Sequence, residues 1–327
     1  MNKLWCSVFL AFLLAACGGG SGNGNNDTLN SDQTANDLRL MSNAISAIRG
    51  IANVGQVKQQ SSLDLAAKRH ADYLVNNGLT SNGSYLYVEQ ANGQWGGHYE
   101  SMVNQGFTGA TPQIRANTAG YAGTVNELAV FGAKSVADCV DAIENSAYHL
   151  VQLISPYVDM GLSFNSGQGG ESACMVLLGV ADNSAGQFPP ADFFIVYPAR
   201  GQTNVAPVFH NQAERPNPAV DLPVAGRPVL ISFYNMANKV LASRDVVIHS
   251  FAMSGAGLQV PLRILAFPEV RSDGPTLVAD SYLGAPGYVV ALPITPLLAN
   301  TTYTVNVSAS VKGNAVTQQW TFSTGSI

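Results

Sequence analysis

A proline-rich stretch that begins at Tyr197-Pro198 divides the chain into two parts with different sequence patterns. Before it, apolar residues recur at the three-and-four spacing of helices, between short apolar runs; after it, β-rich segments alternate with Gly, Pro, Asn or Asp clusters. About 290 of the 327 residues follow residue 36, enough for two hydrophobic cores. The sequence therefore predicts an α+β domain over 37–197, a linker over 198–222 and an all-β domain over 223–327.

End signals and spacing define the expected elements of the first domain. Apolar residues at helical spacing predict a helix from Leu38 to Ile48. Ser61, three residues before Asp64, predicts the capped start of a second helix, which Gly78 ends. Further elements are expected as helices opening at Thr111-Pro112 and at Ser135, and as buried strands at Leu128–Phe131, Met160–Phe164 and Cys174–Val180. Helices interleaved with few strands predict a layered domain.

The second domain has the strand spacing of a β-sandwich. The expected strands are Val229–Tyr234, Val246–Phe251, Leu277–Leu283, Tyr288–Leu292, Tyr303–Val311 and Val316–Phe322. Leu297–Tyr303 resembles the tyrosine corner of immunoglobulin-like sandwiches, in which the phenol bonds back to the backbone. Gln319–Thr324 resembles the last strand of bacterial Ig-like domains. The resemblance implies an Ig-like module that serves as a spacer or an adhesion surface.

The N-terminal segment has the layout of a secretory signal, with Lys3 followed by the apolar run Leu4–Leu14. Leu14-Ala15-Ala16-Cys17 resembles a lipobox, which implies a signal peptide over 1–17 and a lipid anchor on Cys17. Residues 18–36 are rich in Gly, Ser and Asn and predict a flexible tether. Because Gly18 stands where a retention signal shows aspartate, the resemblance implies the outer membrane or cell surface. The alternative is an ordinary cleaved signal with an incidental cysteine.

Composition restricts the partners and the redox state. The net charge is −5 and only 11% of residues are charged, with no lysine or arginine cluster to neutralise a phosphate backbone, so nucleic acid is not an expected partner. The membrane is the expected partner, through the lipid anchor. In an oxidising compartment, Cys139 and Cys174 are expected to form a disulfide; the alternative is two buried free thiols.

A series of short motifs in the first domain resembles the CAP superfamily (cysteine-rich secretory, antigen 5 and pathogenesis-related 1 proteins), whose fold is an α-β-α sandwich. The motifs are Ala66–Ala71, Gly97-His98, Val125–Ala129, Ser146–His149 and Pro156–Gly161. The chain departs from the family pattern in the swapped order of Asn126-Glu127, in Ile143 where bacterial members often have tryptophan, and in Leu150 where arginine is common. Glu144 and Glu100 are the candidates for the family's second cavity glutamate.

The resemblance implies that His98, Glu127 and His149 converge in a cleft, which Glu100 could also reach. A cleft of this kind without a recognisable nucleophile predicts a non-enzymatic protein that presents a small, lipid-like ligand site or a surface for a protein partner. Neutral imidazoles and a carboxylate are also ordinary zinc ligands, so these three residues are candidates for a zinc site; the alternative is a hydrogen-bonded structural cluster. The alternatives are therefore a metal-dependent hydrolase acting on envelope or extracellular material, with Glu127 or Glu100 as base, and an adhesive or structural surface lipoprotein.

Two further polar residues are expected to be structural. His70 shares a helical face with Ala66 and Leu74, which predicts a buried, hydrogen-bonded imidazole. Ser146 and His149 invite comparison with a serine hydrolase, but the sequence has no Gly-x-Ser-x-Gly elbow around Ser146 and no evident third residue. Ser146 is therefore expected to cap or hydrogen-bond the backbone.

Overall fold

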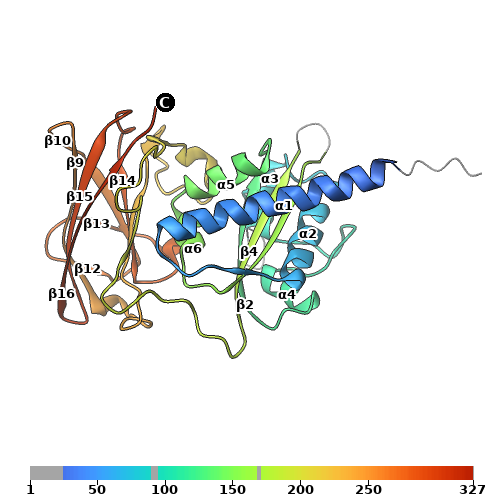
Figure 1. The fold of residues 1–327 in the computed structure, drawn as a ribbon, viewed down its shortest axis with the longest axis horizontal. Coiled ribbons are helices and arrows are strands. Elements are labelled where there is room, and N and C mark those ends of the chain that lie inside the picture. The colour runs from blue at the N-terminus through green and yellow to red at the C-terminus, as the bar shows by residue number, and fades with distance from the viewer. Residues whose placement is uncertain (1–24, 90–94, 168–170, 327) are drawn as a thin grey trace, which may run out of the picture.

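The computed structural model describes residues 25–89, 95–167 and 171–326, with side chains from residue 35 onward (Figure 1). The expected signal peptide, the lipobox Cys17 and the first part of the tether lie outside the described residues. The chain is mixed α/β, with several sheets and few helices. Within the described part, no helix is long and apolar enough to cross a bilayer.

The first part of the chain holds the α-helices. They are α1 Asn25–Ile51, α2 Ser61–Asn76, α3 Gly83–Leu86, α4 Pro112–Thr118, α5 Val136–Glu144 and α6 Tyr148–Leu153, with the 3-10 helix η1 at Gly96–His98. The four-stranded first sheet has the order β1-β3-β4-β2 and is formed by β1 Lys58–Gln59, β2 Gly123–Phe131, β3 Asp159–Asn165 and β4 Ala173–Ala181.

Two larger sheets follow. The second sheet, in the order β13-β11-β14-β8-β5, contains β5 Ile195–Tyr197, β8 Val229–Ser232, β11 Leu262–Ala266, β13 Leu277–Ala279 and β14 Tyr288–Pro293. The third sheet, in the order β10-β9-β15-β16 with β12 beside β9, contains β9 Val246–Gly255, β10 Leu258–Gln259, β12 Arg271–Ser272, β15 Thr302–Val311 and β16 Asn314–Ser323. Shorter elements are β6 Val208–Phe209, η2 Asn211–Ala213, β7 Ala225–Gly226, η3 Ser243–Asp245 and η4 Ser281–Leu283.

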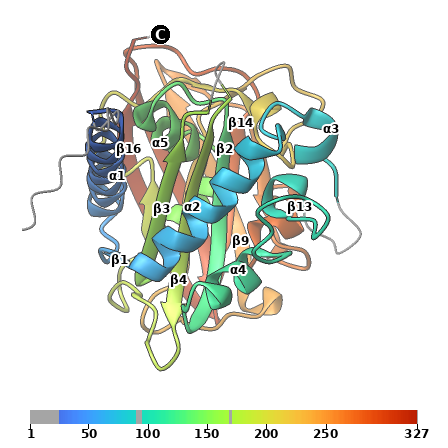
Figure 2. The same cartoon turned by 90° about the vertical axis from the view of Figure 1, so that its right-hand side faces the viewer.

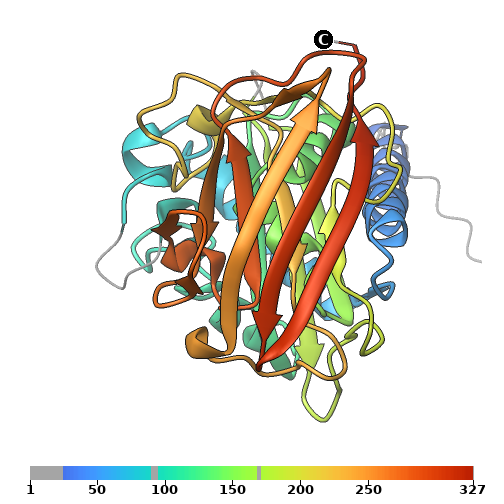
Figure 3. The ribbon, with the colours of Figure 1, turned by 90° about the vertical axis from the view of Figure 1, so that its left-hand side faces the viewer.

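The first and second sheets are each buried on both faces, so the elements stack in layers (Figure 1). Along β4, Met175 and Leu177 pack toward α2, which crosses this face in Figure 2, whereas Val176 and Leu178 face α1, α5 and α6. In the second sheet, the face that includes Leu230 packs against the same helices, and its other face packs on the third sheet. The order is thus α2, first sheet, helices α1, α5 and α6, second sheet, third sheet. The outer face of the third sheet is open in Figure 3.

Most of the helix starts expected from the sequence are present. The Thr111 side chain accepts from the Ile114 N–H at 3.3 Å at the start of α4, and the Ser135 side chain accepts from the Asp138 N–H at 3.2 Å at the start of α5. The capping arrangement expected at Ser61 is wrong. Ser61 is the first helical residue, Gln60 occupies the N-cap position without a side-chain cap, and Asp64 accepts from the Leu162 N–H at 2.8 Å. Asp64 therefore joins α2 to β3.

Two segments differ from the sequence expectation. Residues 25–36, expected as tether, form the first turns of α1, although their sequence has no apolar residues at helical spacing. The strand β5 precedes the boundary drawn at Tyr197, yet it pairs with β8. This pairing joins sequence-distant segments, so local periodicity does not reveal it. The division into separate domains stays a prediction, since one core cluster includes side chains from both parts.

Two expected cross-links are present. Cys139 on α5 and Cys174 on β4 form the predicted disulfide, with Cα atoms 6.4 Å apart, in the core between the helices and the first sheet. In the second part, the Tyr303 hydroxyl accepts from the Leu298 N–H at 2.7 Å. That hydrogen bond is the one expected of a tyrosine corner.

Candidate cleft with a buried polar cluster behind it

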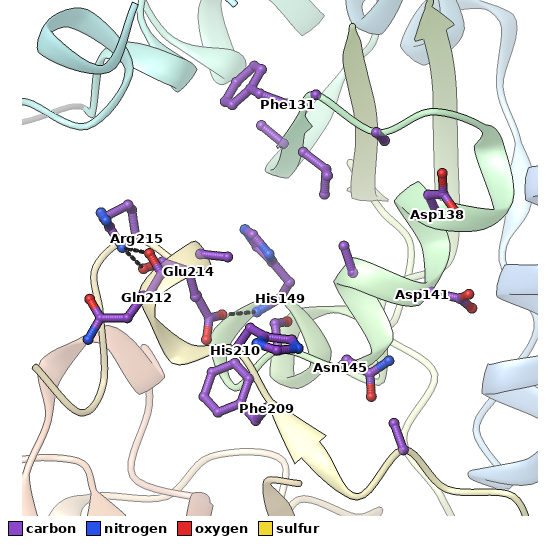
Figure 4. A pocket seen from close by; sticks show the side chains of 18 of the residues that line it. Phe131, Asp138, Asp141, Asn145, His149, Phe209, His210, Gln212, Glu214 and Arg215 are labelled. Carbon is purple, nitrogen blue, oxygen red and sulfur yellow. Dashed lines mark hydrogen bonds between the residues drawn. The ribbon is translucent and has the colours of Figure 1, made fainter. Parts of the chain in front are cut away.

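A cavity of about 820 Å³ lies where the first part of the chain meets the segment after β5 (Figure 4). Its walls come from η1, β2, α5 and α6 on one side and from residues 204–215 on the other. Aromatic side chains line it, among them Trp95, Phe131 and Phe209, together with the imidazoles of His98, His149 and His210. The space is therefore a mainly apolar cavity with a few polar groups, which is the usual character of a small-molecule site.

His149 is held in this wall by the start of α6. Glu214, from the segment after β6, accepts from the N–H groups of Ala147 and Tyr148 at 2.8 Å each and from that of His149 at 3.3 Å (Figure 4). These are backbone donors that a helix start leaves without intrahelical partners. A carboxyl group from a distant part of the chain thus caps α6 and holds the backbone that carries His149.

Burial determines the protonation of both groups. Burial, with a smaller effect from His98, lowers the pKa of His149 to about 4, so the imidazole is neutral at pH 7. Burial raises the pKa of Glu214 to about 7, although the N–H donors of Ala147, Tyr148 and His149 act in the opposite direction. The cavity wall therefore carries a neutral imidazole and a carboxyl group that titrates near neutrality.

His98 lies on the cavity wall with Glu127 directly behind it. The Nδ1 atom of His98 is 3.0 Å from Oε1 of Glu127, and the His98 side chain is 24% exposed whereas that of Glu127 is 1% exposed. The Arg115 Nη2 atom donates to both Glu127 oxygens, at 2.8 and 2.9 Å. Burial opposes ionisation of Glu127, but the charges of Arg115, His70 and His98 outweigh it and hold the pKa of this carboxyl well below its usual range.

His70 and Glu100 complete a buried cluster of charged side chains. The His70 Nε2 atom lies 2.9 Å from the Gly97 carbonyl oxygen, and its Nδ1 atom lies 3.0 Å from Glu100 Oε1. Glu100 also accepts from the N–H groups of Thr108 and Gly109. Although burial favours the neutral acid, the His70 hydrogen bond and charge, the Thr108 N–H and Arg115 together lower the pKa of Glu100.

The expected site residues thus divide into two groups. His98 and His149 line the cavity, while Glu127 and Glu100 lie behind its wall within the buried cluster. The expectation of a buried, hydrogen-bonded His70 is confirmed. Glu144 accepts from the Tyr197 hydroxyl at 2.6 Å, so it joins α5 to β5.

Ser146 has the structural role expected of it. Its hydroxyl donates to the Ile143 carbonyl oxygen at 2.7 Å and accepts from the Leu150 N–H at 3.3 Å. The hydroxyl thus bonds the backbone on both sides of the α5–α6 junction.

The described residues contain no group of three or more His, Cys, Asp or Glu side chains arranged to hold a metal ion. In the expected set of His98, Glu127 and His149, the Glu127 carboxylate already accepts from the Arg115 guanidinium and faces His98. In metal sites, a metal-bound histidine commonly donates its other ring N–H to a carboxylate, which orients the imidazole. Glu127 stands in that relation to His98. Zinc binding stays a prediction.

Sequence reasoning missed Arg115, Glu214 and His210. Arg115 lies in a short helix whose sequence gives no sign of burial, and Glu214 lies in the segment expected as a linker. The one available signal was the low charged fraction of 11%, which makes each charge inside an expected helix or linker a candidate for a structural role.

No family model matches the chain, and no curated protein matches it. Solved structures that match part of it include an outer surface protein from Borrelia burgdorferi, with 18% sequence identity and a TM-score of 0.35. The match covers 45% of this chain and 94% of that chain. A similarity at this level defines neither a family nor a function for the protein.

Proposed function

We infer that this protein is an exported, lipid-anchored CAP-domain protein that uses its His/Glu cleft to bind a small lipid-like ligand or a protein partner without chemical turnover. The observation that carries the proposal is the cavity of about 820 Å³ whose wall includes both His98 and His149. Its size is within the range of about 300–1,000 Å³ typical of small-molecule sites.

The layering of the first part of the chain supports the CAP assignment. The first sheet lies between α2 and the helices α1, α5 and α6, which is an α-β-α arrangement. The expected cavity histidine His98 and the signature glutamate Glu127 are 3.0 Å apart although 29 residues separate them in sequence. The open third sheet and the Tyr303 hydrogen bond support an Ig-like module in the second part of the chain.

The polar cluster behind the cleft supports a binding role because it makes the wall rigid. Arg115 fixes the Glu127 carboxylate, which contacts His98, and Glu100 fixes His70, so the cluster holds His98 at a fixed place on the wall. On the other side, Glu214 holds the backbone of His149. A preorganised wall lowers the cost of ordering side chains when a ligand binds.

Export and the lipid anchor rest on the sequence of residues 1–17, from the apolar run to Cys17. The proposed location is the cell envelope, at the outer membrane or the cell surface. Metabolic labelling with a radioactive fatty acid tests this point: label is expected in the wild-type chain and not in Cys17→Ala.

The test of the cleft uses cis-parinaric acid, a fluorescent fatty acid, and energy transfer from Trp95 on the cavity wall. We expect saturable transfer with the wild type. His98→Ala/His149→Ala is expected to bind at least about tenfold more weakly, which corresponds to a loss of about 1.4 kcal/mol of binding free energy. Ala206→Trp, which fills the cavity, is expected to abolish saturable transfer, whereas Ala237→Trp on an exposed segment serves as its matched control. If His98→Ala/His149→Ala and Ala206→Trp bind the fatty acid as tightly as the wild type and the control, a lipid-like ligand in this cleft is contradicted.

A metal-dependent hydrolase is the second candidate, favoured by the Glu127 carboxylate that orients His98 from behind. Native mass spectrometry after addition of stoichiometric zinc tests it. A zinc adduct that chelator removes and that His98→Ala/His149→Ala lacks is expected of this candidate. Identical spectra for the wild type and the double variant contradict it and leave the binding cleft or an adhesive role.

A further inference from the structure

The third sheet carries a cluster of side chains far from the cleft, on its outer face. His249 lies on β9, Ser310 on the neighbouring β15, and Asp273 follows β12. The His249 Nδ1 atom is 2.7 Å from Asp273 Oδ1, and its Nε2 atom is 2.6 Å from the Ser310 hydroxyl. The three side chains thus form a hydrogen-bonded chain in the order Asp–His–Ser.

The backbone around this chain is shaped to bring the three residues together. The pairing of β9 with β15 shifts register so that Ser308 pairs with Ser250 and Ala309 with Ile248, which leaves His249 as the extra residue of a β-bulge. Bulges re-aim side chains.

On the other side of His249, a tight turn brings in Asp273. A Cβ at Gly274 would lie only 1.9 Å from the His249 carbonyl oxygen, so a glycine is required for this close approach. The Ser272 hydroxyl donates to the carbonyl oxygens of Ile248 and Pro275, at 2.9 and 2.7 Å, which fixes the turn.

The hydrogen bonds determine which nitrogen of His249 carries the proton when the ring is neutral. The Asp273 side chain is 65% exposed, and as an ionised carboxylate it can only accept, so the Nδ1–H of His249 donates to it. The Nε2 lone pair then accepts the Ser310 O–H. A serine hydroxyl bonded to an imidazole that a carboxylate orients is the arrangement that activates serine as a nucleophile.

We propose that Ser310, His249 and Asp273 form a nucleophilic triad that accepts acyl groups from carboxylic esters. In the first step the Ser310 oxygen bonds to the ester carbonyl carbon while His249 Nε2 takes the hydroxyl proton. The carbon–alkoxide bond then breaks, and the imidazolium returns the proton to the leaving alcohol. In the second step water attacks the acyl-serine through the same imidazole, which releases the acid and restores Ser310.

The surroundings define the class of ester. Figure 3 shows the sheet open to solvent, and the neighbours of Ser310 on this face include Ser308 and the small Ala315. An open strand face accepts a small acyl group on an accessible alcohol but does not enclose the oxyanion of a tetrahedral intermediate. Because an oxyanion-hole donor contributes about 10²–10³ in rate, we expect slow turnover and an acyl-serine that persists long enough to be detected.

The test follows reaction of the full chain with p-nitrophenyl acetate, by release of nitrophenol and by mass analysis of the peptide that ends at Lys312. We expect one acetyl group on Ser310 in the wild type. Ser310→Ala is expected to lose this acetylation, and Asp273→Asn to slow it by about 10² or more, because the ring then lacks the orienting carboxylate. Ser308→Ala, on the same strand and face, is the matched control and is expected to react like the wild type.

Circular dichroism and thermal unfolding of all variants show whether Ser310→Ala and Asp273→Asn keep the fold, as surface polar substitutions should. Acetylation that is as fast in Asp273→Asn as in the wild type, that occurs at other residues and not at Ser310, or that Ser308→Ala loses to the same extent, would overturn the triad. Because none of these residues touches the cleft, failure here leaves the lipid-binding proposal unaffected.

Discussion

The Nη2 atom of Arg115 lies 2.8 and 2.9 Å from the two carboxylate oxygens of Glu127, where the two side chains are 0% and 1% exposed. Removing one partner of a buried pair leaves an uncompensated charge, which costs about 3–5 kcal/mol. We therefore expect Arg115→Met to lower the free energy of unfolding in urea by that amount. Arg39→Met, an exposed arginine on α1, is the control and should change it by less than about 0.5 kcal/mol.

The double variant Arg115→Met/Glu127→Leu separates the charge from the packing. If the unpaired carboxylate causes the loss, removing it as well should restore most of the stability. A double variant that is less stable than Arg115→Met alone would show that the Glu127 carboxylate stabilises the fold through His98 and His70 even when Arg115 is absent.

The Cys139–Cys174 disulfide closes a loop with a sequence separation of 35 residues between α5 and β4. On the chain-entropy account, a loop of this length contributes about 3–4 kcal/mol by restricting the unfolded chain. We expect the reduced protein to unfold at a correspondingly lower urea concentration than the oxidised one. Equal midpoints would mean that the unfolded chain is already compact in this region.

The hydrogen bond between the Tyr303 hydroxyl and the Leu298 N–H is expected to stabilise the second part of the chain. Tyr303→Phe removes the acceptor of the Leu298 N–H and is expected to cost about 1–2 kcal/mol, because a backbone donor loses its partner. Tyr282→Phe, at a side chain that is 51% exposed, is the matched control with no expected effect. Similar losses in both variants would argue against the hydrogen bond between Tyr303 and Leu298 as a specific cross-link.

What the sequence could predict in the fold followed from local signals. Spacing and caps gave the starts of α4 and α5, the strand runs gave β3 and β4, and the number of cysteines gave the disulfide. The pairing of β5 with β8 was not predictable in this way, because a three-residue strand has no period of its own and its partner is distant in sequence, with Tyr197 pairing with Leu230.

The candidate site was predictable only in part. Resemblance to a family grouped His98, Glu127 and His149, and the first two are in contact. The resemblance could not show that Glu127 is bound by Arg115, because a lone arginine in a short polar helix looks like a solvated charge. The chain of Asp273, His249 and Ser310 was equally hidden, since a bulge and a glycine turn, not a motif, bring these residues together.

Glu214 gives a prediction about pH. Its folded pKa is raised to about 7 from the ordinary value of 4.5, so between these two values the folded chain holds a proton that the unfolded chain has released. Stability from this group is therefore present at low pH and is lost as the pH rises toward and through 7. From pH 5 to pH 8 the loss is on the order of 2–3 kcal/mol.

Glu214→Gln isolates this effect, because it cannot titrate. His149, whose lowered pKa makes stability rise with pH between about 4 and 6.5, acts in the opposite direction but is present in both proteins. We expect Glu214→Gln to be less stable than the wild type at pH 5, since its amide NH₂ faces the N–H donors of α6. The difference in free energy of unfolding between the two proteins is expected to shrink by about 2–3 kcal/mol by pH 8.

Urea unfolding at both pH values measures this difference, with Glu269→Gln at an exposed position as control. A gap that stays constant or widens with pH would show that the N–H donors keep Glu214 ionised throughout, and that the cap on α6 is a fixed charge.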